Sequence, residues 1–442
     1  MESNGRPERS KKRTGRILGA LLGLLSVGLL VNWWALSQDE PLATMPTAPM
    51  PNPNAYDFYI AAGHARTQSK QIDAIMKKPI APRTPEEEKE LERIEAMIQQ
   101  EAPALQLLHQ GFAYEYRNPP SAPGALHPEY SVFRGIARLL AMQSRVRAAR
   151  GDWNGAADSS LDAIRMGEDI PHGGALIAAM VGIACQSIGQ STMWDTVDHL
   201  NAAQSRAAAQ RLQSIMERRY AYAETMLEEK RVGQVGFQET LRKVSMRTAL
   251  STANSLSFNF RGESVSTSPR YVAALYLLYG KKLLMHNYVT YMDQLAVLDR
   301  QPYGLHLPPP SLPSDPITKN FLTIFYMSRL NSVRTETQNS LLLVTLLLHA
   351  FQLEHGHYPN ALAELAPAYL KGLPDDPFAA QGTFHYLLKG SDYVLYSVGP
   401  DGKDDGGTPI DDPQKANSTS GRRRYQVFED SRGDVVAGTN FP

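Results

Sequence analysis

Apolar residues recur at three- and four-residue spacing from Ala55 to about Leu298, and strand-like alternation is scarce across this stretch. A period of about 3.6 residues places apolar side chains along one face of a helix, whereas a half-buried strand alternates at every second residue. Because 442 residues exceed what one hydrophobic core usually supports, we expect more than one domain. The sequence therefore predicts a mainly α protein with a multi-helix, repeat-like body over residues 55–300.

Helix caps divide this body into segments. Thr84 is a suitable N-cap residue, because its side chain can accept a hydrogen bond from the first turn, and Pro85 fits the first helical position. Asn201 and Ser268 offer the same kind of start to later helices. The caps and stops predict helices or helical hairpins over residues 84–100, 131–167, 201–229 and 268–298.

Residues 131–167 resemble one tetratricopeptide repeat. The small and capping residues that carry this resemblance are Ala148, Gly151, Asp152, Ala156 and Ala163. No neighbouring segment repeats the pattern at the expected period of about 34 residues. The resemblance therefore implies a single repeat-like helical hairpin and not a peptide-binding array.

The segments after this hairpin are marked by small residues and by prolines. The stretch Gly173–Gly189 is rich in glycine and alanine, which predicts a helix packed closely against its neighbours and buried. Prolines crowd residues 301–316 and predict a linker there. A long, apolar helix is expected from about Ile317 to Leu353, at the start of a last domain over residues 317–442.

The N-terminus has the pattern of a membrane anchor. A basic segment, residues 1–16, precedes an uncharged stretch long enough to cross a bilayer, residues 17–36. Positively charged flanks stay in the cytoplasm, so we expect a single pass through a bacterial inner (cytoplasmic) membrane with the bulk of the chain outside. A proline-rich linker, residues 37–54, follows. The alternative is a signal peptide cleaved near Ser37, which would release the protein.

Composition narrows the range of partners and activities. The chain has 45 basic and 45 acidic residues, and this balance argues against nucleic acid, which needs an excess of Lys and Arg. Cys185 is the single cysteine and lies in an apolar stretch, so we expect a buried, inert thiol. The motifs of nucleotide-binding loops, serine hydrolases and zinc proteases do not occur in the sequence. We therefore predict a protein without enzymatic activity.

The C-terminal part carries the strongest chemical signal. After Tyr396 the sequence runs Ser-Val-Gly-Pro-Asp-Gly-Lys-Asp-Asp-Gly-Gly, and Asp411 and Asp412 follow shortly. Glycines permit backbone conformations with positive φ, so carbonyl and carboxylate oxygens can turn toward one cation, and calcium takes six to eight such oxygens. An EF-hand is rejected because Lys403 occupies its third position. The pattern predicts a calcium loop, with a solvated acidic turn as the alternative.

Short strands are expected to hold this loop. Residues 383–388 and 393–398 run apolar or alternate, with Lys-Gly-Ser-Asp between them, and so predict a small antiparallel sheet. A third strand is expected at Arg424 to Phe428. A sheet this small buries little apolar surface, so a bound ion would add stability.

From about residue 339 to the end, the chain resembles the C-terminal part of the major pseudopilin (G-type) of type II secretion systems. The motifs that carry the resemblance are His355-Gly356-His357-Tyr358-Pro359, Leu373-Pro374-Asp375-Asp376-Pro377-Phe378 and Tyr396-Ser397-Val398-Gly399-Pro400-Asp401-Gly402. In that family a calcium ion ties the loop together through carboxylates and backbone carbonyls. The resemblance makes Asp401 a ligand, and the further candidates are Val398 through its carbonyl, Asp404, Asp405, Asp411 and Asp412. The span 17–36 departs from the family's pattern in lacking the glutamate that pseudopilins carry there, which weakens the expectation of polymerisation like that of a pseudopilus.

These observations favour a membrane-anchored, extracytoplasmic scaffold that binds other proteins of the cell envelope, with secretion machinery among the candidates. Two alternatives stay open. The chain could be a component of a secretion system or pilus that assembles through its pseudopilin-like part. It could also be an exported hydrolase with a carboxylate site that the sequence does not reveal. A pocket with two facing acidic side chains would support this alternative.

Overall fold

A computed structural model describes residues 19, 21–31, 34, 49–67, 69–75, 84–121, 125, 127–243, 256–260, 263–267, 269–315, 318–319, 322, 328–413 and 422–440. The described part is mainly helical and contains a small three-stranded antiparallel sheet, which confirms the predicted class. The helices are α2 (Ala55–His64), α3 (Ser69–Ile75), α4 (Pro85–Gln100), α5 (Ala102–Gly111), α6 (Glu129–Ala149), α7 (Trp153–Asp169), α8 (Leu176–Trp194), α9 (Ala202–Met216), α10 (Tyr222–Lys243), α12 (Pro269–Asp299) and α14 (Ser328–His355). The strands are β1 (Leu256–Phe260), β2 (Glu263–Thr267), β3 (His385–Lys389), β4 (Asp392–Ser397) and β5 (Val435–Val436).

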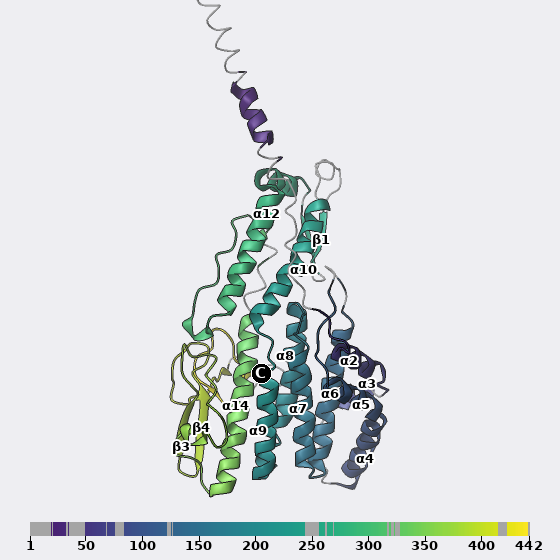
Figure 1. Cartoon of the computed structure of the whole chain (residues 1–442), viewed down its shortest axis with the longest axis vertical. Helices are drawn as coiled ribbons and strands as arrows, with labels where there is room; N and C mark the ends of the chain where they lie inside the picture. Colours follow the sequence, from purple (N-terminus) through teal and green to yellow (C-terminus); the bar gives the residue numbers. More distant parts are fainter. Residues whose placement is uncertain are drawn as a thin grey trace, which may run out of the picture. The chain divides into compact units, whose positions relative to one another are not determined.

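The chain divides into two compact units, and each is made of segments distant in sequence. The first unit consists of Met1–Met45, Lys230–Asp293 and Ser311–Thr323. The second consists of Pro46–Glu229, Gln294–Pro310 and Ile324–Pro442. Within the second unit, α6, α7, α8, α9 and α14 lie side by side as long rods, and the sheet of β3 and β4 lies against α14 (Figure 1).

The predicted caps form as the sequence indicates. Thr84 accepts a hydrogen bond from the backbone nitrogen of Glu87, whose carboxylate binds the backbone nitrogen of Thr84 in return. Gly151, with φ of 78°, ends the turn between α6 and α7, and the Asp152 carboxylate accepts a 2.9 Å hydrogen bond from the backbone nitrogen of Gly155. The helical hairpin of residues 131–167 is therefore confirmed as α6 and α7.

Glycines allow α7 and α8 to approach closely. A Cβ atom added to Gly182 on α8 would lie 2.5 Å from the carbonyl oxygen of Gly167 on α7, closer than real Cβ atoms come. The segment Leu176–His199, which contains α8, is long and apolar enough to cross a membrane by length and composition. However, 61% of its apolar window is buried, and a core helix passes the same test. The contacts of α8 with α6, α7 and α14 match the packed helix that the small residues predict.

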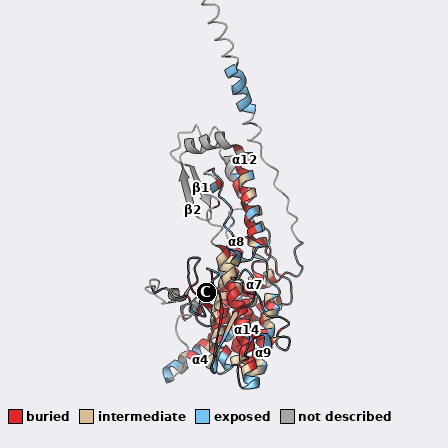
Figure 2. Cartoon of the chain, turned by 90° about the vertical axis from the view of Figure 1, so that its left-hand side faces the viewer, coloured by how far each residue is buried: buried red, intermediate tan, exposed pale blue. Residues whose placement is uncertain are grey.

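One hydrophobic core in the second unit joins the helical body to the C-terminal module, which is the small sheet of β3, β4 and β5 with the loops around it. It contains Leu161 of α7, Leu212 of α9, Leu347 of α14 and Leu395 of β4. Figure 2 shows many buried residues in α7 and α14. A second core gathers α2, α4, α5 and α6 around Tyr59 and Phe133. The sheet is thus packed on the body by apolar contacts, without a separate core of its own.

Three expectations about secondary structure were wrong. The helix expected over residues 201–229 is broken at residues 217–221, between α9 and α10. No glycine or proline marks this break, where Arg218 and Arg219 form ion pairs with Asp169 and Glu336. The expectation of helix almost throughout residues 55–298 missed the hairpin of β1 and β2, although Leu256-Ser257-Phe258-Asn259-Phe260 alternates with the period of a strand.

The third correction concerns the small sheet. Residues 422–425 form a turn of 3₁₀ helix, and the third strand is β5, in which Val435 pairs with Ser397. Val435 is fully buried, whereas the expected strand starts inside a run of three arginines whose charges favour solvent. The first two strands lie where the pattern predicted them, with Leu387 opposite Val394.

The N-terminal predictions are described only in part. Residues 1–16 and 37–48 lie outside the described residues, as do many residues at the start of the long helix expected from Ile317. Leu21–Val31 forms an apolar helix that is shorter than a membrane span. The spanning segment over residues 17–36 therefore stays a prediction.

Candidate functional site

The acidic loop follows β4 and depends on glycine. Four of its glycines have positive φ: 72° at Gly399, 69° at Gly402, 68° at Gly406 and 79° at Gly407. Residues other than glycine rarely adopt such backbone conformations. These four glycines therefore produce the sharp turns that fold the loop back on itself. The loop lies beside the strand pair, because the Tyr396 hydroxyl of β4 reaches the carboxylate of Asp404 at 2.9 Å.

Asp401, Asp404 and Asp405 take different roles in the loop. Asp401 accepts a 3.2 Å hydrogen bond from the backbone nitrogen of Lys403. Asp404 accepts hydrogen bonds from the Gly406 nitrogen and the Tyr396 hydroxyl, and these two contacts lower the pKa of its carboxyl. The carbonyl of Asp405 accepts a bond from the Thr408 hydroxyl. These contacts are local, and each stabilises one turn of the loop.

Asp434 is a site residue that the sequence reasoning missed. Its carboxylate accepts hydrogen bonds from the backbone nitrogens of Asp405, at 3.3 Å, and Gly407, at 2.7 Å. Burial raises the pKa of the Asp434 carboxyl, and the neighbouring charges of Asp404 and Asp405 raise it further. The Asp434 carboxylate thus holds the loop at Asp405 and Gly407, close enough to Asp404 and Asp405 for their charges to act on it. The signal was a lone aspartate between Gly433 and the β5 strand, about thirty residues downstream of the loop.

Asp411 and Asp412 lie in a separate contact with the 3₁₀ turn. Both carboxylate oxygens of Asp411 bind the Arg424 guanidinium, which lowers the pKa of Asp411. The backbone nitrogen of Asp412 donates to the Arg424 carbonyl at 2.9 Å. Arg424 thus holds the carboxylate of Asp411 and the backbone of Asp412, and the Asp411 carboxylate is occupied by this ion pair.

Val398 is held by a second carboxylate that the sequence analysis did not assign. Asp376 is buried and accepts hydrogen bonds from the Ser397 hydroxyl at 2.7 Å and from the backbone nitrogens of Val398 and Phe378, both at 3.0 Å. Burial raises the pKa of the Asp376 carboxyl, and its hydrogen bonds oppose that rise. Asp376 therefore anchors the start of the loop to the segment before β3.

The geometry can be compared with what a metal ion needs. Within the described residues, no group of three or more His, Cys, Asp or Glu side chains is placed to hold a metal ion. Among the loop residues, Asp404 and Asp405 act through their charges on the carboxyl of Asp434. A calcium ion at this loop would draw first on these three residues, together with Asp401 and the Val398 carbonyl.

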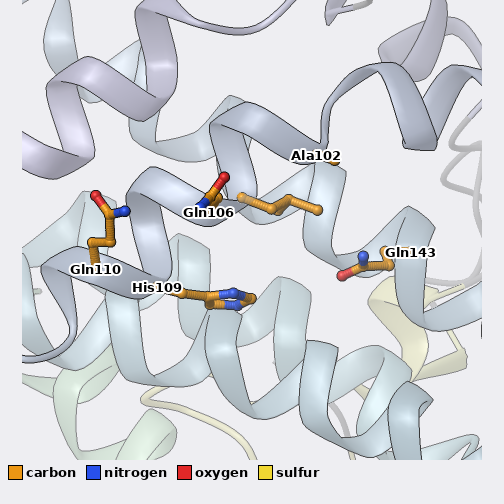
Figure 3. Close-up of a pocket in the computed structure, with 6 residues that line it drawn as sticks. Ala102, Gln106, His109, Gln110 and Gln143 are labelled. Carbon is orange, nitrogen blue, oxygen red and sulfur yellow. The ribbon is translucent and has the colours of Figure 1, made fainter.

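A pocket of about 480 Å³ lies in the helical body, between α5 and α6 (Figure 3). His109, Gln106 and Gln110 come from α5, and Gln143 comes from α6. The ring of His109 contacts Asp162 of α7, with 2.8 Å between Nε2 and Oδ2. This hydrogen bond raises the pKa of His109, against the effect of burial. The six residues that line the pocket include no serine, threonine or cysteine.

No protein-family model, no curated protein and no solved structure matches this chain.

Proposed function

We propose that this chain is a single-pass, membrane-anchored protein whose body lies outside the cytoplasm and binds other proteins of the envelope. The C-terminal module would act as a calcium-stabilised cap similar to that of the major pseudopilin, with secretion machinery as a candidate partner. The order of a long helix, a short 3₁₀ segment (Leu362–Leu365), two antiparallel strands and a glycine-rich acidic loop supports this proposal.

The observation that carries the proposal is the surface of the helix Leu21–Val31. Its apolar side chains are all largely exposed: Leu21, Leu22, Leu24, Leu25, Val27, Leu29, Leu30 and Val31. An exposed apolar surface of this kind is costly in water and is stabilised in a lipid bilayer. The basic residues before it would keep the N-terminus in the cytoplasm.

Strand β3 supports the interaction part of the proposal. The sheet order is β3-β4-β5, so one edge of β3 has no neighbouring strand among the described residues. Leu387 and Leu388 on this strand are 39% and 40% exposed. An extended segment of a partner could add to this edge through main-chain hydrogen bonds and cover both leucines.

The calcium part rests on the charges at the loop. Asp404 and Asp405 raise the pKa of Asp434, so the three carboxylates repel one another when ionised. A bound calcium ion would remove this repulsion, and glycines with positive φ let the surrounding carbonyl oxygens turn toward it. Asp411 would contribute only after its carboxylate is released from Arg424.

Cysteine labelling tests the membrane topology directly. Cys185 is buried, and burial raises the pKa of its thiol to about 12, so the native chain should give little background. A membrane-impermeant maleimide is added to cells with an opened outer membrane, which carry either Ser10→Cys or Ser391→Cys. Labelling of the Ser391→Cys variant alone is expected, since Ser391 lies in the exposed turn after β3. Equal labelling of both variants would contradict the single-pass topology.

Photo-crosslinking tests the partner surface. A benzophenone amino acid replaces Leu387 on β3, and the matched control replaces Leu353, an exposed leucine at the end of α14. We expect a discrete adduct at position 387 in native membranes and a weaker one at position 353. No difference between the two positions would reject β3 as the binding edge. An adduct of twice the chain's mass would instead favour the pilus-like alternative, in which the chain assembles with itself.

A second candidate function, an exported hydrolase, is favoured by the His109–Asp162 pair beside the pocket of Figure 3. A histidine oriented by a carboxylate can act as a general base. The test compares the purified native protein with the His109→Asn variant on fluorogenic ester, phosphate and peptide substrates. Hydrolysis that is lost in the variant would support the enzyme, and equal rates would reject it.

A further inference from the structure

A second cavity, of about 590 Å³, lies within the second compact unit, and its wall includes Asp376, which binds the backbone of Val398 at the start of the loop. Four segments line it: the start of α10, the end of α12 with the turn that follows, the first turns of α14, and the loop of residues 375–382. This volume is in the range of pockets that hold small organic ligands, roughly 300–1,000 Å³.

The buried carboxylate of Asp299 forms part of the cavity wall. The Asp299 side chain is 1% exposed, and neither of its oxygens has a hydrogen-bond partner among the described residues. Among the described residues, its one charged neighbour is Arg329, whose Nε lies 3.4 Å from Oδ1, too distant for a strong hydrogen bond. A buried carboxylate without hydrogen bonds is costly, so this position is suited to a donor supplied by a ligand.

Arg329 itself has little capacity left for a ligand. Its Nη2 donates a 2.5 Å hydrogen bond to the carbonyl of Gln301, and its guanidinium carbon lies 5.3 Å from the centre of the Tyr303 ring. Burial raises the pKa of Asp299 to about 7, and Arg329 opposes that rise. The attraction of Arg329 therefore does not offset the loss of water around this carboxylate.

The charges of the cavity wall favour a cation over an anion. Each of the three arginines in the wall has an acidic partner: Arg219 with Glu336, Arg300 with Glu224, and Arg329 with Asp299. Asp375 also lines the cavity and is exposed, and it has no ion-pair partner among the described residues. The wall thus contains one carboxylate without hydrogen bonds and a second without a counter-charge.

We propose that this cavity binds an organic cation, an ammonium or guanidinium group, whose N–H donors bind the Asp299 carboxylate and whose charge is balanced by Asp375. The same group can belong to a small amine or to the lysine or arginine side chain of a partner protein. Charge-assisted hydrogen bonds of this kind contribute enough to change affinity about 10- to 100-fold.

Calorimetric titration of the full chain in detergent tests this site. The probes are 1,5-diaminopentane, the neutral 1,5-pentanediol and the blocked peptide acetyl-Lys-Lys-Lys-amide. We expect the diamine to bind and the diol not to bind. Tighter binding of the peptide than of the diamine would indicate a basic segment of a partner, and binding of the diamine alone would indicate a small amine. Failure of both cations to bind would overturn the proposal.

Matched variants assign the binding to the cavity. Asp299→Asn should weaken diamine binding about 10-fold or more. Asp158→Asn is the control, because Asp158 is paired with Arg211 and does not line the cavity. The affinity of this variant for the diamine should equal that of the native chain. If Asp299→Asn does not fold, Asp375→Asn decides the question, since it leaves the buried pair intact. Unchanged diamine affinity in Asp375→Asn would then refute the site.

Discussion

Ionisation of Glu168 should make the protein less stable as the pH rises. Glu168 lies on α7 with a buried side chain, beside a cavity of about 40 Å³ that has room for one or two water molecules. Burial raises the pKa of this carboxyl to about 8; Arg219 works against the rise and Glu336 adds to it. The folded protein therefore keeps Glu168 protonated at neutral pH, although an exposed glutamate would be ionised.

The sign and size of the effect follow from this difference in pKa. The folded state binds the proton more tightly than the unfolded state, where the pKa is 4.5. The contribution to stability is fully present below that value and is lost as the pH rises through about 8. The loss in the free energy of unfolding is about 4 kcal/mol between about pH 5 and pH 8.5. Glu168→Gln keeps the shape of the side chain and cannot ionise, so this variant should not show the loss.

Urea unfolding of the full chain in detergent measures the effect. The fluorescence of Trp153 and Trp194 reports on the second unit, to which Glu168 also belongs. At about pH 8.5, compared with about pH 5, the free energy of unfolding of Glu168→Gln should exceed that of the native chain by about 4 kcal/mol more. Glu92→Gln, at an exposed position on α4, should follow the native chain. The reasoning is refuted if Glu168→Gln and the native chain lose stability in parallel.

Three further changes test other parts of the structure. Gly182→Ala should reduce the free energy of unfolding by about 1–3 kcal/mol in urea, because its Cβ would lie 2.5 Å from a carbonyl oxygen of α7; an unchanged value would mean that the two helices can separate at little cost. Thr84→Ala should reduce the stability of α4 by about 1 kcal/mol, because the capping box is lost. Amide exchange in the first turn of α4 should become faster, and unchanged exchange there would contradict this prediction. Asp162→Asn should lower the pKa of His109, measured by NMR titration, because the main cause of its rise is removed; a constant pKa would show that Asp162 is not that cause.

The parts of the fold set by local chemistry could be predicted from sequence. Thr84 and Asp152 cap helices because their side chains bind backbone nitrogens only three residues away. The strand pair around Gly390 is likewise a local structure, whose turn and alternation are visible in the sequence. The hairpin of β1 and β2 has the same kind of signal, and the expectation of continuous helix hid it.

The remaining features depend on contacts between distant segments, which no local pattern reveals. Asp434 reaches the loop from a position after the 3₁₀ turn, and Asp376 reaches it from before β3. Arg424 binds Asp411, which the sequence assigned to the metal. Asp299 and Arg329 meet because α12 ends at the same cavity at which α14 begins. The candidate loop was therefore found from sequence, but the partners that determine its charges were not.

The central claim, that the C-terminal loop binds and is stabilised by calcium, is tested most directly by the melting temperature of the full chain. The full chain is needed because the module shares its hydrophobic core with the helical body. With a dissociation constant of about 10⁻⁴ to 10⁻³ M, about 10 mM calcium should add about 1–3 kcal/mol and raise the melting temperature by several degrees over the chelator-treated chain. Asp401→Ala and Asp434→Asn should each abolish this rise. Identical melting curves of the native chain in calcium and in chelator would contradict the claim.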